Sequence, residues 1–269
     1  MSLGLLRACH PLPTAAMTLV ITAYAWSVGW RGAPLVGVLA AVLLGQLSVG
    51  WSNDAFDSAL DRRVGRLDKP TVQGAVQARK LWGCAVAALA ASVVVSWWIA
   101  GWQRGSFHVL AVLMAWLYNT VLSRTPWSWL PYAVAFAALP PFLSLGLDGT
   151  WPPAWTLVLF PIVGVSAHLA NALPDIDSDR AAGVDGLAIR LGARRSAGLC
   201  WMLLLLGSGI LVIVAWPQSR ALSAVVVAGC VAAALLARRR AVRTAVFQGL
   251  VVAVIVDVVV IDVLTVIGA

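Results

Sequence analysis

Long apolar runs alternate with short polar breaks along almost the whole chain. Nine of these runs come close to the roughly 20 residues that a helix needs to cross about 30 Å of hydrocarbon. They lie at residues 13–30, 34–52, 80–100, 106–122, 127–147, 154–174, 196–216, 219–237 and 244–267. Every break between them contains charged residues, glycine or proline, which is typical of loops. The pattern predicts an all-α membrane protein with nine transmembrane helices in one bundle.

The composition agrees with a location in the lipid bilayer. Hydrophobic residues make up 61% of the 269 residues and charged residues only 11%, the mean hydropathy is +0.90, and glutamate is absent. Such a chain cannot cover itself with the charged surface of a soluble protein. We therefore expect one polytopic domain over residues 1–269 rather than separate soluble domains.

The distribution of the basic residues predicts an orientation. The formal net charge is +8, but the basic residues stand beside the apolar runs, so they do not indicate binding to nucleic acid. If the loops between nine spans alternate sides, 16 of the 19 Lys and Arg residues fall on one side of the membrane. Lys and Arg are enriched in cytoplasmic loops. We therefore expect a cytoplasmic amino terminus in a multi-pass protein of a bacterial-type cell membrane.

Two polar clusters follow the second and the sixth apolar run. They consist of Asn53, Asp54, Asp57 and Asp61, and of Asn171, Asp175 and Asp179. In each cluster an Asn and two Asp stand four residues apart, a spacing that places all three side chains on one face of an α-helix. The clusters lie 118 positions apart. This arrangement predicts two pseudo-repeated four-helix halves plus a ninth helix, with a shared site between the halves.

The clusters have the chemistry of a metal–diphosphate site. Neighbouring carboxylates repel each other by about 4 kcal/mol per pair at 4 Å unless a cation lies among them. Carboxylate oxygens suit Mg²⁺, which also takes water and phosphate oxygens as ligands. Basic residues follow each cluster, and such residues bind phosphate. A substrate with a diphosphate at one end and hydrocarbon at the other fits a site of this kind at the cytoplasmic face of an apolar bundle.

The motif at residues 53–61, the pair Asp175 and Asp179, and the nine predicted spans resemble the UbiA superfamily of intramembrane prenyltransferases over essentially the whole chain. The resemblance implies Mg²⁺-dependent transfer of an isoprenyl group from an isoprenyl diphosphate, through an allylic cation, to an acceptor. The implied metal ligands are Asn53, Asp54, Asp57, Asp61, Asp175 and Asp179. The implied catalytic aspartates are Asp54, Asp57, Asp175 and Asp179. The implied diphosphate-binding residues are Arg66, Lys69, Arg124 and Arg180.

Polar and aromatic residues near the clusters are candidates for substrate contacts. They are Asn171, Tyr118, Asn119 and His168. His168 precedes Asn171 by about one helical turn, but a single histidine among Ser, Ala and Leu is equally compatible with a packed interior position. His10, just before Pro11, either borders the acceptor entrance or faces the cytosol.

Two positions depart from the pattern of the family. Residues 183–188 lack a threonine that many members have after the second cluster, and Ser123-Arg124 stands where many members have a basic pair. Both positions lie near the expected diphosphate or acceptor region. They leave the identity of the acceptor and the chain length of the donor open.

Two other functions share parts of this pattern. An intramembrane terpene cyclase would use the same diphosphate site but close the cation on its own chain, without an acceptor. A cation transporter would distribute ionisable residues through the depth of the membrane, whereas eight of the 11 aspartates lie in the segments of the two clusters. The pattern therefore favours the prenyltransferase over the transporter.

Overall fold

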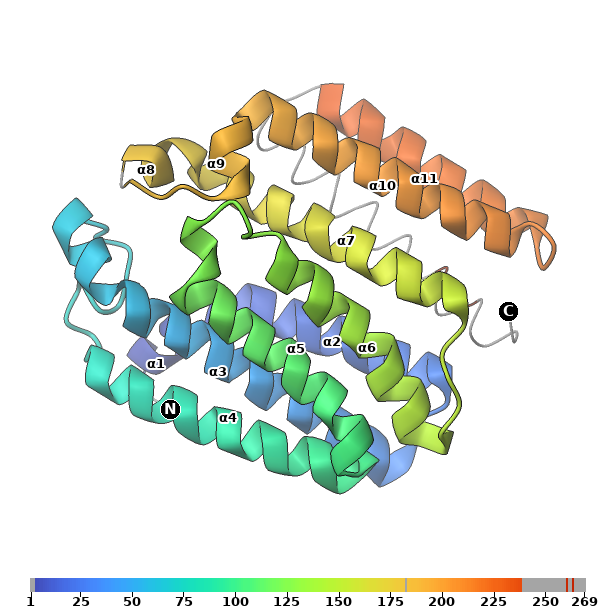
Figure 1. Ribbon diagram of the computed structural model, residues 1–269, viewed down its shortest axis with the longest axis horizontal. Coiled ribbons are helices and arrows are strands. Elements are labelled where there is room, and N and C mark those ends of the chain that lie inside the picture. Colours follow the sequence, from blue (N-terminus) through green and yellow to red (C-terminus); the bar gives the residue numbers. More distant parts are fainter. Residues whose placement is uncertain (1–2, 182, 239–259, 261–262, 264–269) are drawn as a thin grey trace.

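The computed structural model describes residues 3–181, 183–238, 260 and 263, and this part of the chain is helical, without a β-strand. Figure 1 shows the long helices running side by side as one bundle. In chain order the elements are α1 (Leu3–Ala8), α2 (Pro11–Val28), α3 (Gly32–Val64), α4 (Ala78–Ala100), α5 (Trp102–Thr120), η1 (Leu122–Arg124), α6 (Leu130–Asp148), α7 (Ala154–Ala172), η2 (Leu173–Asp175), α8 (Ile176–Ala181), α9 (Leu187–Leu191), α10 (Ala193–Ala215) and α11 (Arg220–Arg238).

The predicted apolar runs correspond closely to the helices. The first eight runs coincide with α2, α3, α4, α5, α6, α7, α10 and α11. Five helical segments in the described part of the chain are long and apolar enough to cross a membrane: α3, α4, α6, α10 and the stretch Ala154–Ala181. The ninth run, at residues 244–267, lies outside the described residues except for two isolated positions. The all-helical membrane architecture is therefore confirmed, whereas the count of nine and the orientation stay predictions.

Helix α3 carries the first aspartate cluster beyond the apolar region. The apolar run predicted a span ending at residue 52, but the helix continues to Val64 and has 33 residues. At 1.5 Å per residue it is about 50 Å long, well over the roughly 30 Å of hydrocarbon. It ends at Gly65, whose φ of 70° is left-handed and whose N–H bonds the Asp61 carbonyl. The cluster is therefore held on a rigid helix that projects past the apolar bundle.

The second cluster is not on one continuous helix, so that part of the prediction is wrong. Helix α7 ends at Ala172, and a 3₁₀ turn over Leu173–Asp175 separates it from the short helix α8. Pro174 explains the interruption, because proline has no N–H to donate and its ring disfavours a continuing α-helix. The break leaves Asp175 in the turn and Asp179 on α8.

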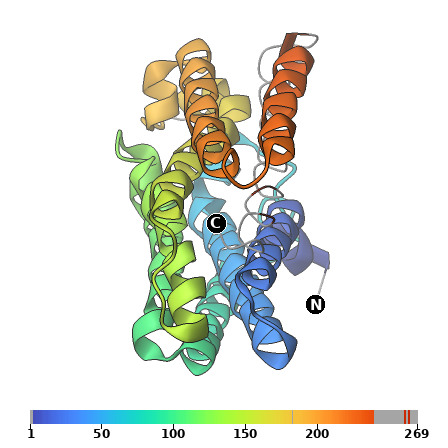
Figure 2. The same ribbon diagram turned by 90° about the vertical axis from the view of Figure 1, so that its right-hand side faces the viewer.

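The bundle is packed around large apolar side chains. Phe142 and Leu143 of α6 are fully buried, and the indole N–H of Trp30 donates to the Leu143 carbonyl at 2.9 Å. On the outside, Trp98 and Ile213 are 80% and 73% exposed, which fits contact with lipid. Figure 2 shows α10 and α11 next to each other on one side of the bundle and α4 on the opposite side. The C-terminal end of α3 and helices α8 and α9 lie at the same end of the bundle in Figure 1.

Candidate functional site

Both aspartate clusters line one cavity of about 280 Å³ at this end of the bundle. From the first cluster, Asn53 and Asp57 of α3 reach the cavity wall. From the second, the wall contains Asn171, Asp175 and Asp179. Two segments that are far apart in the sequence therefore meet around one space.

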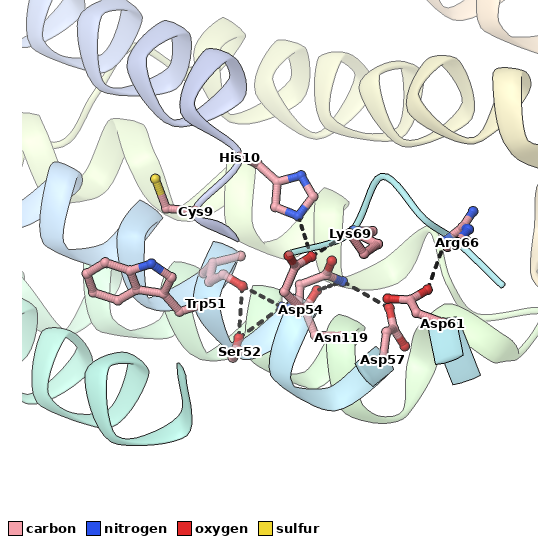
Figure 3. Close-up of polar contacts among 12 residues, drawn as sticks. Cys9, His10, Trp51, Ser52, Asp54, Asp57, Asp61, Arg66, Lys69 and Asn119 are labelled. Atoms are coloured by element: carbon pink, nitrogen blue, oxygen red, sulfur yellow. Dashed lines mark hydrogen bonds and ion pairs between the residues drawn. The ribbon is translucent and has the colours of Figure 1, made fainter. Parts of the chain in front are cut away.

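Each aspartate of the first cluster is paired with a basic side chain, and Figure 3 shows Lys69 beside Asp54 and Arg66 beside Asp61. Lys69 Nζ lies 2.7 Å from Asp54 Oδ1. Arg124 Nη2 lies 3.0 Å from Asp57 Oδ1, and Arg66 Nη1 lies 3.5 Å from Asp61 Oδ1. These ion pairs place positive charge among carboxylates that would otherwise repel one another.

Arg66 connects the two clusters. Its second terminal nitrogen, Nη2, lies 3.8 Å from Asp179 Oδ1, so one guanidinium faces Asp61 of the first cluster and Asp179 of the second. Burial would by itself lower the pKa of Arg66, but the charges of Asp61, Asp175 and Asp179 outweigh it and raise the pKa above its usual value. Arg66 therefore keeps its charge and holds the two segments together across the cavity.

The oxygen atoms of the clusters fit a divalent cation that completes its shell with other ligands. Among the described residues, no three His, Cys, Asp or Glu side chains form a ready metal-binding group. Asp61 is only 1% exposed, and its Oδ2 atom is buried without a hydrogen-bond partner in the described part of the chain. An ionised oxygen in that situation costs free energy unless a cation reaches it. This donor set fits Mg²⁺, which typically takes one or two carboxylates together with water and phosphate oxygens.

Asn119, a predicted substrate contact, has a supporting position instead. It is buried, and its Nδ2 donates to the Val49 carbonyl and to Ser52 Oγ, each at 3.0 Å. Its Oδ1 accepts a hydrogen bond from Asn53 Nδ2 at 3.4 Å. Asn119 therefore links α5 to α3 and orients Asn53, while it does not line the cavity.

His168 and Tyr118, two of the candidate substrate contacts, lie at the cavity wall. They are next to two residues that the sequence did not single out, Ser128 and Tyr132. The ring of His168 lies 5.7 Å from the ring of Tyr118 and 5.1 Å from that of Tyr132. Its Nε2 lies 3.1 Å from Ser128 Oγ, which in turn accepts a hydrogen bond from the Leu187 N–H at 3.0 Å.

The tautomer of His168 decides which atom donates in its contact with Ser128. Ser128 is fully buried, and its hydroxyl group can either donate to His168 Nε2 or accept from it. The other ring nitrogen, Nδ1, is buried and has no hydrogen-bond partner among the described residues. Nothing in the sequence around Ser128 marked it, because its partners come from α7 and from the first residue of α9.

Two of the predicted site residues, Arg180 and Asp54, do not line the cavity. Arg180 donates to the Ile189 carbonyl at 3.0 Å and lies 4.0 Å from Asp177, outside the set of residues that line the cavity. Asp54 is 1% exposed and is likewise not part of the wall, although its partners Lys69 and His10 are. His10 does not simply face the cytosol, because its Nε2 lies 3.0 Å from Asp54 Oδ1.

The segments that depart from the family pattern do border the site. Ser123, Val184, Gly186 and Ala188 line the cavity. A Cβ atom at Gly186 would lie 2.8 Å from the Ser123 carbonyl oxygen, so these two segments approach too closely for a side chain. Both departures therefore change the surface that a substrate would contact.

Comparisons with known proteins identify the family. The model of the UbiA prenyltransferase family matches residues 12–248. The chain therefore belongs to the UbiA prenyltransferase family, and the resemblance seen in the aspartate motifs is confirmed. With its apolar helices, it is a multi-pass integral membrane protein.

Relatives of the chain are named for two different prenyl-transfer activities. A digeranylgeranylglyceryl phosphate synthase of Methanoregula boonei is 32% identical over 181 residues, which cover 66% of this chain and 64% of that protein. A 2-acylphloroglucinol 4-prenyltransferase of Humulus lupulus is 26% identical over 218 residues, which cover 73% of this chain and 50% of that protein. The chain thus matches less than two thirds of the length of each.

Solved structures share the fold over nearly the full length. A UbiA homologue of Archaeoglobus fulgidus bound to DMAPP and Mg²⁺ superposes with a TM-score of 0.69 at 15% identity, covering 98% of this chain and 99% of that one. The apo structure of a UbiA homologue of Aeropyrum pernix K1 gives a TM-score of 0.72 at 17% identity, covering 93% and 96%. At these identities the likeness shows a common fold.

Proposed function

We propose that this protein is a membrane prenyltransferase that transfers an isoprenyl group from an isoprenyl diphosphate to an acceptor. The observation that carries the proposal is the cavity shared by the two aspartate clusters, with Arg66, Lys69 and Arg124 among its lining residues. Carboxylates suited to Mg²⁺ and cations suited to phosphate thus face the same space. One domain over residues 1–269 performs the reaction at a site on the cytoplasmic side of a bacterial-type membrane.

The proposed Mg²⁺ ligands are the cavity-facing members of the two clusters and Asp61. They are Asn53, Asp57, Asp61, Asp175 and Asp179, whereas Asp54 is engaged by Lys69 and His10. When bound, Mg²⁺ supplies positive charge that stabilises the departing diphosphate. Asn119 keeps the Asn53 amide in position through the hydrogen bond between their side chains.

In this proposal the basic residues pair with the aspartates before substrate binds and with the diphosphate afterwards. Without substrate, Arg66 and Arg124 neutralise the carboxylates of the clusters. With substrate, both guanidinium groups turn to the diphosphate oxygens, for which their planar fork is well suited. Lys69 adds a third positive charge from the loop after α3. Their charge stabilises the diphosphate as the bond to the isoprenyl carbon breaks.

Tyr118 and His168 form an aromatic part of the cavity wall, and the ring of Tyr132 packs against both of them. Aromatic faces stabilise a nearby cation, and the surrounding apolar bundle keeps water from it. The named relatives include a glyceryl phosphate lipid synthase and a phloroglucinol prenyltransferase. We therefore propose that the acceptor is a molecule that resides in the membrane, and we do not assign it to one chemical class.

The proposal is tested with purified protein in lipid nanodiscs, Mg²⁺ and geranyl diphosphate. A geranylgeranylglyceryl phosphate and an acylphloroglucinol serve as trial acceptors, and mass spectrometry detects prenylated products. We expect transfer to one acceptor class, loss of transfer on chelation with EDTA, and recovery with added Mg²⁺.

Matched variants separate this reaction from other outcomes. Asp57→Asn and Asp175→Asn should each lower the rate by at least about a hundredfold, because each removes charge from the shared site. A cyclic hydrocarbon formed without any acceptor would identify a cyclase instead. Full activity of both variants would overturn the proposed site.

A further inference from the structure

The N-terminal segment, residues 3–10, packs directly against the first aspartate cluster. The indole N–H of Trp51 donates to the Leu5 carbonyl at 2.9 Å. The backbone of Cys9 lies so close to α3 that a Cβ atom at Gly50 would be 2.6 Å from the Cys9 carbonyl oxygen. Both contacts lie within four residues of Asp54 along α3.

The same segment also holds the loop that carries Arg66 and Lys69. Arg7 Nη1 donates to Gln73 Oε1 at 2.9 Å, and Arg7 Nη2 donates to the Asp68 carbonyl at 3.2 Å. A Cβ atom at Gly4 would lie 2.6 Å from the Ala75 carbonyl oxygen. The N-terminal segment therefore touches both α3 and the loop that follows it.

His10 ends this segment in an unusual backbone conformation. Its φ of 52° and ψ of 68° are left-handed, and among the described residues it is the one non-glycine with a positive φ. Such a conformation persists where surrounding contacts enforce it, and it occurs often at functional sites. Here it directs the imidazole to the aspartate cluster (Figure 3).

Asp54 joins His10 to Lys69. Its Oδ1 lies 3.0 Å from His10 Nε2 and 2.7 Å from Lys69 Nζ. An ionised carboxylate only accepts hydrogen bonds, so Nε2 is a donor here. His10 and Lys69 both line the cavity, whereas Asp54 lies behind them with 1% exposure.

From this geometry we infer that His10 is a positioning residue for the diphosphate site. It fixes the Asp54 carboxylate, and this carboxylate holds the ammonium group of Lys69 at the cavity wall, where it contacts the diphosphate. The inference rests on the proposed function. His10 lies just before residues 12–248, the part of the chain that the family model matches.

Two variants of His10 separate its hydrogen bond from its backbone conformation. His10→Gln keeps an N–H donor near the position of Nε2. His10→Asn tolerates the left-handed backbone well, but its side chain is too short to reach Asp54. The probe is inorganic pyrophosphate with Mg²⁺, and its dissociation constant is measured from the rise in the melting temperature of the purified protein.

We expect His10→Asn to weaken pyrophosphate binding about tenfold, and His10→Gln to stay within about twofold of the original protein. In steady-state assays His10→Asn should raise KM for the isoprenyl diphosphate and leave kcat nearly unchanged. In a Lys69→Met background, His10→Asn should have little further effect, since it acts through Lys69. Wild-type affinity of His10→Asn, equal losses in both His10 variants, or independent effects of His10→Asn and Lys69→Met would overturn the inference.

Asp57→Asn and Asp175→Asn distinguish this result from a failure of the proposed function. If both bind pyrophosphate with Mg²⁺ as tightly as the original protein, the diphosphate site itself is refuted. If they lose binding while His10→Asn does not, only the role of His10 is refuted.

Discussion

At the scale of single residues, Arg66 makes the connection on which the site depends. It is the side chain whose guanidinium lies near Asp61 of the first cluster and Asp179 of the second. Its raised pKa follows from the three carboxylates around it, which outweigh the effect of burial, so the guanidinium is charged at neutral pH. Removal of Arg66 leaves those carboxylates facing each other.

We expect Arg66→Met to lower kcat/KM for the isoprenyl diphosphate about 10- to 100-fold, the effect of losing hydrogen bonds to charged groups. Arg66→Lys should recover only part of it, because an ammonium group cannot reach two partners with a planar fork. Arg63→Met, an exposed arginine in the last turn of α3, is the control and should keep full activity. Equal activity of Arg66→Met and Arg63→Met would contradict the role of Arg66.

Ser128 has a structural role at the same scale. Its buried hydroxyl group is hydrogen-bonded to His168 and to the Leu187 N–H, and it thereby joins α7 to the start of α9. Ser128→Ala leaves both partners buried and unpaired, so we expect a loss of about 1–3 kcal/mol in the free energy of unfolding. Thermal unfolding in detergent measures it.

Ser106→Ala is the matched control for this loss. Ser106 is a partly exposed serine on α5, so its replacement should change the free energy of unfolding by no more than about 0.5 kcal/mol. An unchanged melting temperature for Ser128→Ala would show that water satisfies the two partners instead.

At the scale of elements, the end of α3 determines where Arg66 and Lys69 lie. Gly65 stops the helix in a left-handed conformation, and no neighbouring atom lies within 4 Å of a Cβ built there. The cost of a side chain at this position is therefore purely conformational.

Gly65→Ala should lower the free energy of unfolding by about 1–2 kcal/mol, the cost of the left-handed region for a residue with a Cβ atom. Gly65→Asn should lose less, because asparagine adopts this region more readily. Gly83→Ala, inside α4 and also without a neighbour within 4 Å, should be neutral or stabilising. A loss in Gly65→Asn as large as in Gly65→Ala would show that α3 does not depend on this conformation.

At the scale of the whole molecule, the distribution of charge predicts where the site lies relative to the membrane. The segment after α3 is rich in Lys and Arg, whereas the turn between α6 and α7 near Asp148 and Thr150 has none. From the positive-inside rule we expect the first segment in the cytoplasm and the second outside.

A cysteine at exposed Leu67 and another at exposed Thr150, each in a protein without its four native cysteines, test this orientation. In intact cells a membrane-impermeant maleimide should label the Thr150 position and spare the Leu67 position. In inside-out vesicles the labelling should reverse. Labelling of Leu67→Cys in intact cells would put the aspartate clusters on the outer side.

The sequence determined the helical membrane class, the places of eight apolar helices and the chemistry of the two clusters. These features depend on local composition and on the helical period of 3.6 residues. Both can be read from one segment of the sequence without knowing which other segments it contacts. The break at Pro174 was also readable from its missing N–H, although the spacing of the aspartates obscured it.

Only the tertiary structure decided which of these residues meet. Arg66 reaches Asp179, Asp54 turns away from the cavity toward Lys69 and His10, and Ser128 bonds His168. These partners are separated by 15 to 113 positions in the chain, and Arg66, Lys69, His10 and Ser128 lie in loops that meet helices α3, α7 and α8. Such contacts depend on how the helices pack and how the loops fold back onto them. The pattern of residues along the chain does not describe either of these.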